Sequence, residues 1–101
     1  MNTQQALQLA FQHLNSGNLP LAGQLFEGVL QQEPRSFAAL NGRGFIALQQ
    51  NRLPHSAADF QQSLVINAQQ PFAYKMLGIV LGAMGQFEAA MQAFAAALAL
   101  D

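Results

Sequence analysis

A repeat of 34 residues constrains this chain more than any other feature. Three phenylalanines stand 34 residues apart, at Phe26, Phe60 and Phe94. The same interval separates three turn signals (Gly17, Asn51 and Gly85) and three small residues (Ala22, Ser56 and Ala90). A unit of this length buries its apolar face only by stacking on its neighbours. The period therefore predicts an array of three similar units.

Each copy is expected to form two helices around its turn signal. Apolar spacing and turn residues predict helices at 3–16, 20–33, 37–50, 54–67, 71–84 and 87–100. Pro20, Pro54 and Pro71 lie where the first turn of a helix tolerates a missing N–H, and Pro34 separates the second helix from the third. The predicted fold class is all-α, with six helices.

Glycines inside two of the predicted helices need a steric reason, because each costs about 1 kcal/mol relative to alanine. The first helix of each copy carries a small residue at one repeated position: Ala10, Gly44 and Gly78. We expect this position to face the small residue of the second helix (Ala22, Ser56 and Ala90), so that the two backbones approach closely. The apolar run from Met76 to Gly85 ends at Gln86, whereas a membrane span needs about 20 residues. No membrane insertion is expected.

Composition excludes several classes of partner and chemistry. Apolar residues make up 51% of the chain and charged residues 9%, with four Lys or Arg against five Asp or Glu. Without a basic patch, nucleic acid and anionic membrane surfaces are not expected as partners. The chain has no cysteine, which removes disulfides, thiol catalysis and thiolate metal sites. The N-terminus lacks the charged and apolar regions of a secretory signal, so we expect a cytoplasmic protein.

Candidate catalytic groups are scattered. His13 and His55 lie in different copies, where His13 is expected to pack and His55 to face solvent. Neither has a partner at metal-ligand spacing. The acidic residues Glu27, Glu33, Asp59, Glu88 and Asp101 form no recurring pair and are expected to be solvated. No catalytic, metal or cofactor-binding residue is predicted, and the chain is not expected to be an enzyme.

The repeated residues resemble the tetratricopeptide repeat, a 34-residue helix-turn-helix with the pattern W-x2-L-G-x2-Y, A-x3-F and P. The third copy shows the pattern best, with Tyr74, Leu77, Gly78, Leu81, Ala90 and Phe94. The first copy has Ala6, Leu9, Ala10, His13, Ala22, Phe26 and Pro34; the second departs most, with Arg43 where leucine is usual and Ala68 in place of proline. The resemblance implies one domain over residues 1–101, a right-handed α-solenoid of three repeats at about 3–36, 37–70 and 71–101.

The resemblance also implies a ligand groove on the concave face, lined by the first helix of each copy. Carried onto this sequence, the groove positions are Leu7, Phe11, Leu14, Asn41, Phe45, Leu48, Lys75 and Ile79, with Gly82 at a position where it could widen the groove. Phe11, Phe45 and Ile79 would form an apolar stripe, and Lys75 would be the main cation. The alternative is that these three apolar residues pack between neighbouring repeats.

The groove composition favours an apolar peptide or an amphipathic helix as ligand. It does not match the family's clamp for a chaperone C-terminal carboxylate: Leu7 and Phe11 replace the Lys and Asn of that clamp, and Gly42 replaces a second Asn. Asn41 stands alone, so an asparagine ladder for extended peptides is also absent. The expected function is a protein-interaction scaffold. The alternative is an N-terminal module of a larger enzyme resembling a glycosyltransferase, or of a secretion-type chaperone or assembly factor.

The last predicted helix is apolar on nearly all sides, and terminal repeats usually need a polar outer face. Met91, Leu98 and Leu100 are the candidate contact residues there. They could pair with a second copy of the chain, bind a different protein, or be covered by further repeats of a longer solenoid. Asp101 is unfavourable at a helix C-terminus, which mildly favours a continuing chain.

Overall fold

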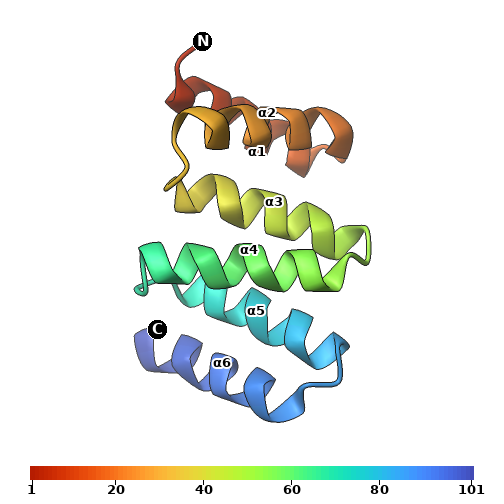
Figure 1. Ribbon diagram of the computed structural model, residues 1–101, viewed down its shortest axis with the longest axis vertical. Helices are drawn as coiled ribbons and strands as arrows, with labels where there is room; N and C mark the ends of the chain where they lie inside the picture. The colour runs from red at the N-terminus through yellow and green to blue at the C-terminus, as the bar shows by residue number, and fades with distance from the viewer.

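The computed structural model describes residues 1–101 as six helices stacked in pairs along an axis 41 Å long (Figure 1). The helices are α1 (Thr3–Asn15), α2 (Leu19–Gln32), α3 (Phe37–Gln49), α4 (Leu53–Ile66), α5 (Pro71–Ala83) and α6 (Phe87–Leu100). Each pair is a helical hairpin, α1 with α2, α3 with α4 and α5 with α6. The predicted all-α fold with six helices is confirmed.

The turns inside the three hairpins have the same backbone geometry. Gly17, Asn51 and Gly85 have positive φ angles of 86°, 59° and 81°, a region that glycine and asparagine tolerate best. The next residue then donates its N–H to the carbonyl five residues earlier, as Arg52 does to Ala47 at 2.8 Å. This is the Schellman arrangement, which satisfies carbonyls that a helix end leaves unpaired. The turn signals of the sequence therefore correspond to the same turn structure, which occurs once in each of the three hairpins.

The repeated phenylalanines make the centre of the packing. Phe26 and Phe60 are fully buried, and each ring lies against a glycine of a first helix. A Cβ built on Gly44 would lie 3.0 Å from the ring of Phe60, and one on Gly78 would lie 2.7 Å from the ring of Phe94. Gly44 and Gly78 thus make room for a phenylalanine ring of the second helix. The small residue of the second helix, which was expected to face the glycine, makes a different contact. In the second copy the Ser56 hydroxyl donates a 2.7 Å hydrogen bond to the Gly44 carbonyl.

Gly42 makes a contact between copies that the sequence analysis did not anticipate. It is buried on α3, and a Cβ built there would lie 2.2 Å from Cζ of Phe26 on α2. The ring of the first copy therefore rests directly on the backbone of the second. Because the other copies have other residues at this position, the 34-residue repeat gave no signal for it.

Most of the buried apolar side chains form two clusters. The larger holds ten residues from α4, α5 and α6: Ala57, Phe60, Leu64, Ala73, Met76, Leu77, Val80, Leu81, Ala90 and Ala93. The smaller holds six from α1, α2 and α3: Ala10, Ala22, Phe26, Val29, Ala39 and Ile46. Each cluster crosses a boundary between copies, so stacking of neighbours creates the core, as a repeat architecture requires.

Candidate functional site

The two layers of the stack differ in how closely their helices approach. The first helices α1, α3 and α5 contact one another in succession, whereas α2, α4 and α6 do not. In a curved stack, helices approach most closely on the inner side. The layer of first helices is therefore the concave side, where the resemblance implies a ligand groove.

The three groove positions on α1 are half-buried. Leu7, Phe11 and Leu14 pack against the smaller core cluster. The ring of Phe11 meets the ring of Phe26 edge-on, with centroids 4.9 Å apart. Edge-to-face pairs of this kind stabilise a core beyond their buried area. These side chains contribute to packing and leave only part of their surface open to solvent.

The side chains at the predicted groove positions on α3 are also engaged in contacts within the protein. Phe45 and Leu48 are half-buried against the larger core cluster. The amide nitrogen of Asn41 donates a 2.8 Å hydrogen bond to Gln70, which in turn donates to the Ser63 hydroxyl at 3.0 Å. The side-chain oxygen of Asn41 is buried and has no hydrogen-bond partner. Asn41 thus helps to hold the link between the second and third copies.

The most accessible of the predicted groove positions lie on α5. Lys75 is exposed, and Ile79 is 40% exposed. Phe72, which the sequence analysis left out, is 52% exposed. It lies three residues before Lys75 and seven before Ile79, a spacing that places all three on one side of a helix. Gly82 lies toward the other helix of its pair instead, since a Cβ there would be 3.9 Å from Ala90.

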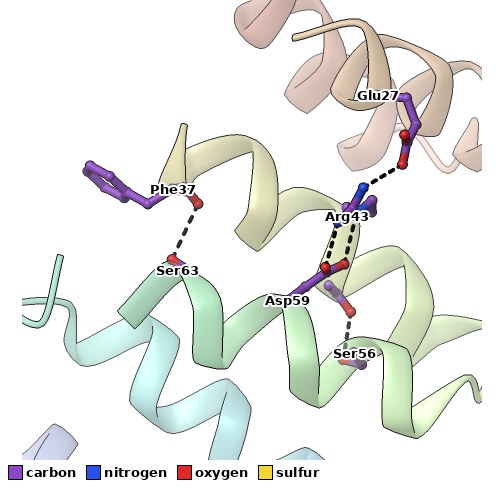
Figure 2. A network of polar contacts seen from close by, with 7 residues as sticks. Glu27, Phe37, Arg43, Ser56, Asp59 and Ser63 are labelled. Atoms are coloured by element: carbon purple, nitrogen blue, oxygen red, sulfur yellow. Dashed lines mark hydrogen bonds and ion pairs between the residues drawn. The ribbon is translucent and has the colours of Figure 1, made fainter. Parts of the chain in front are cut away.

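A polar hollow of about 740 Å³ lies on the opposite, outer side, between α2 and α4 with α3 as its floor. Arg43 of α3 lines this hollow, and its side chain lies between those of Glu27 and Asp59 (Figure 2). Its guanidinium binds both carboxylate oxygens of Asp59 at 2.8 and 3.0 Å, and Glu27 at 2.9 Å. The hydrogen bonds to Asp59 raise the pKa of Arg43 above its usual range, although burial acts in the opposite direction. His55 is exposed at the edge of the hollow, as expected.

The expectation that the acidic residues are solvated is wrong for Asp59, which is only 7% exposed. The physical reason is Arg43 of the same copy, whose guanidinium binds both oxygens of the Asp59 carboxylate and so compensates for its burial. An arginine at a position where the repeat usually has leucine was the available signal for this pair. Together with the ion pair between Arg43 and Glu27, it links α2, α3 and α4.

The outer surface of α6 carries an exposed apolar stripe. Met91 is 70% and Leu98 76% exposed, and Phe87 and Phe94, which the sequence analysis did not assign to this surface, lie on the same side of the helix. These four residues are hereafter called the α6 stripe. Leu100 is 37% exposed, but it lies roughly 200° round the helix from Leu98 and does not share the stripe.

No group of three or more His, Asp or Glu residues comes close enough to hold a metal ion. None of the six helices combines the length and the apolar character that crossing a bilayer requires.

Neither a protein-family model nor a curated protein sequence matches this chain. Solved structures do match. A structure of MamA superimposes with a TM-score of 0.92 at 19% identity, over 99% of this chain and 58% of the MamA chain, so this chain spans less than two thirds of that protein. The second TPR of Spaghetti (RPAP3), bound to the HSP90 peptide SRMEEVD, matches with a TM-score of 0.93 at 14% identity, over 98% of this chain and 92% of the other.

A mutant O-GlcNAc transferase of Thermobaculum terrenum matches with a TM-score of 0.94 at 23% identity, over 97% of this chain and 19% of the transferase. At these identities the similarity concerns the fold, which is held in common although most side chains differ. The 34-residue period, the three hairpins and these superpositions agree. The chain has the tetratricopeptide-repeat fold, with three pairs of helices corresponding to three repeats.

Proposed function

We propose that the protein is a non-catalytic scaffold that binds an apolar peptide or an amphipathic helix in its concave groove. The observation that supports this best is the surface of α5, where Phe72 and Ile79 stay exposed on either side of Lys75. Large apolar side chains that share one helix face and remain open to solvent are typical of a protein-interaction surface. The half-buried Phe11 and Phe45 would extend this surface along the first helices.

The ligand we propose is mainly apolar. Lys75 is the one charged residue among the predicted groove positions, so it can pair with a single carboxylate of a ligand. Anchors at helical spacing, i, i+3 or i+4 and i+7, would match an apolar face of this size. An acidic C-terminal peptide such as the one bound to the RPAP3 repeat domain is not proposed, because Leu7 and Phe11 stand where the carboxylate clamp has polar residues.

The groove can be tested with displayed peptides. A library of short peptides is selected on the wild-type chain, and selected peptides are then measured by fluorescence anisotropy against Ile79→Glu. We expect peptides with apolar residues at helical spacing, bound at least about tenfold more weakly by Ile79→Glu because a carboxylate replaces an apolar anchor. Phe45→Glu is a poorer test, since Phe45 also packs against the core and its loss would destabilise the fold.

A matched control is Val65→Glu, which places the same charge on an 83% exposed apolar residue of α4. This variant should bind selected peptides as the wild type does. Failure to select any peptide, or equal binding by Ile79→Glu and the wild type, would contradict the groove assignment. Circular dichroism of both variants shows whether the helices are intact.

Self-association through α6 is the second part of the proposal. The α6 stripe leaves Met91 and Leu98 open to solvent, and exposed apolar surface of this kind favours association. Size-exclusion chromatography with light scattering tests it over a wide range of protein concentration. A monomer at every concentration would contradict this part without affecting the groove.

A second candidate is a binding module within a larger protein. It is favoured by the match to the O-GlcNAc transferase, in which a segment similar to this chain makes up 19% of a longer protein. The size of the native product in its own cells distinguishes the two, because the chain alone has a mass of 10.9 kDa. A cytoplasmic location stays a prediction from the sequence, which fractionation of the same cells would test.

A further inference from the structure

The repeat itself indicates what kind of surface the α6 stripe is. The residues 34 positions before Met91, Phe94 and Leu98 are Ala57, Phe60 and Leu64 of α4, and all three are buried against α5. Phe60 is fully buried, whereas Phe94 is 38% exposed. The positions of the stripe are thus those that receive the next helix of the stack in the preceding copy. Figure 1 shows that α6 lies at one end of the stack with no helix beyond it.

The opposite end of the stack has a different surface. The positions of α3 that receive Phe26 and its neighbours are Ala39, Gly42 and Ile46, and those of α5 that receive α4 include Ala73, Met76 and Val80. The equivalent positions of α1 are Gln5, Gln8 and Gln12, and all three side chains are exposed. The first helix therefore presents a glutamine face where the other first helices present an apolar one.

Head-to-tail stacking of two copies would press this glutamine face against the α6 stripe. Burying an amide without a hydrogen-bond partner costs about 1–3 kcal/mol, and the stripe offers no polar partner. The N-terminal face of a second copy is therefore a poor occupant of the stripe. The α6 stripe of a second copy is a better one, because apolar surface then meets apolar surface.

The spacing of the stripe also suits pairing with itself. Its members follow one another at intervals of four, three and four residues: Phe87, Met91, Phe94 and Leu98. This order of intervals is the same in both directions along the helix. In an antiparallel pair, Phe87 of one copy would lie opposite Leu98 of the other, and Met91 opposite Phe94.

We propose that two copies of the chain associate through their α6 stripes, antiparallel and about a two-fold axis near residues 92 and 93, to form a closed dimer. This deepens the self-association part of the proposed function and rests on it. The four side chains offer on the order of 500 Å² per copy, less than the roughly 800 Å² per partner of a standard interface. A reversible dimer is therefore expected, with a dissociation constant in the micromolar range or weaker.

Sedimentation equilibrium of the 101-residue chain tests the stoichiometry. A closed dimer stops at two copies as the concentration rises, whereas head-to-tail stacking continues to grow. Leu98→Glu should raise the dimer dissociation constant at least about a hundredfold, because it places a carboxylate from each copy in the apolar contact. Val65→Glu, with the same charge on α4, and Gln8→Glu with Gln12→Glu, on the opposite end of the stack, should leave the dimer unchanged.

Spin labels distinguish the arrangements directly, because the chain has no cysteine of its own. A cysteine introduced by Glu88→Cys lies beside the stripe. Two labels there would be about 20 Å apart in the antiparallel dimer. Head-to-tail stacking would separate them by about one stack length, 41 Å.

A monomer at all concentrations, growth beyond two copies, or a dimer lost in the Gln8 and Gln12 variant would each overturn the proposal. A label separation near one stack length would do so as well. Association that Leu98→Glu abolishes but that does not stop at two copies would contradict the closed dimer and leave self-association through α6 standing. Peptide binding by Leu98→Glu should equal that of the wild type, so failure of the groove and failure of the dimer are separate results.

Discussion

The ring of Phe26 rests on the backbone of Gly42, so closely that a Cβ at residue 42 would lie 2.2 Å from the ring atom Cζ. This contact joins α2 of the first copy to α3 of the second. Phe26 is fully buried, and its ring also meets Phe11, which leaves it little freedom to move away. The stacking of the first two copies therefore depends on the absence of a single methyl group.

Gly42→Ala should lower the free energy of unfolding by about 1–2 kcal/mol. Overpacking a filled site costs about 1–3 kcal/mol, and the better helix propensity of alanine offsets up to about 1 kcal/mol of this. Chemical denaturation followed by circular dichroism measures the change. Gly28→Ala is the matched control: nothing lies within 4 Å of its Cβ position, so it should stabilise the fold by about 0.5–1 kcal/mol. Equal effects of the two substitutions would contradict the close contact.

Replacing Arg43 should destabilise the protein because it leaves the buried carboxylate of Asp59 without its partner. We expect Arg43→Met to lower the free energy of unfolding by about 1–3 kcal/mol. The double variant Arg43→Met with Asp59→Leu should recover most of this loss, since neither charge remains to be buried. Urea denaturation of the single and double variants measures both changes. If the double variant were no more stable than Arg43→Met alone, the unpaired carboxylate of Asp59 would not be the cause of the loss.

Glu27 should matter much less than Asp59. Its carboxylate binds the same guanidinium but is about half exposed, and exposed ion pairs contribute about 0–1 kcal/mol. Glu27→Gln should therefore change the free energy of unfolding by less than about 1 kcal/mol, with a smaller effect at high salt. If Glu27→Gln lowered the free energy of unfolding as much as Arg43→Met does, the contact of Arg43 with Glu27 would be the stronger of the two.

The same truncation should have different costs in the second and third copies. Phe60→Ala removes a fully buried ring and should cost about 3–5 kcal/mol. Phe94→Ala removes a ring that is 38% exposed and should cost about 1–2 kcal/mol in the monomer. Thermal and chemical denaturation at low protein concentration compare them without a contribution from association. Similar costs would mean that the third copy is packed as fully as the second.

Ser56→Ala tests a hydrogen bond that only the second copy has. The hydroxyl donates to the Gly44 carbonyl in a fully buried setting, and the equivalent residues of the other copies, Ala22 and Ala90, show that alanine fits there. The substitution should lower the free energy of unfolding by about 1 kcal/mol. Denaturation in urea measures it, and no change would mean that the hydroxyl contributes nothing net.

The repeat predicted the six helices well because the same pattern of residues occurs in all three copies. The six predicted helices agree with the observed ones within one residue at each end, and the turn residues have the expected backbone role. Contacts that differ between copies gave no periodic signal. The Phe26–Gly42 contact, the Arg43–Asp59 pair and the hydrogen bonds of Gln70 all belong to this class.

The candidate site was predictable only as a set of positions. The first helices share one layer, but how much of each side chain stays open depends on tertiary packing. Phe11 is half-buried against Phe26 and Phe45 against the larger core cluster, whereas Ile79 on α5 is 40% exposed. Phe72 lies at a different repeat position from Phe11, Phe45 and Ile79, so an apolar stripe defined by one repeat position does not include it.

The division of the core into a larger and a smaller cluster has a consequence for binding. The first pair of helices is held by six buried apolar residues, against ten at the other end, so local opening should begin at α1 and α2. A peptide long enough to contact both Phe11 and Ile79 would bind only molecules in which that pair is docked. Its apparent affinity would then include the equilibrium between docked and open forms, and hydrogen exchange of α1 would slow in proportion to ligand occupancy.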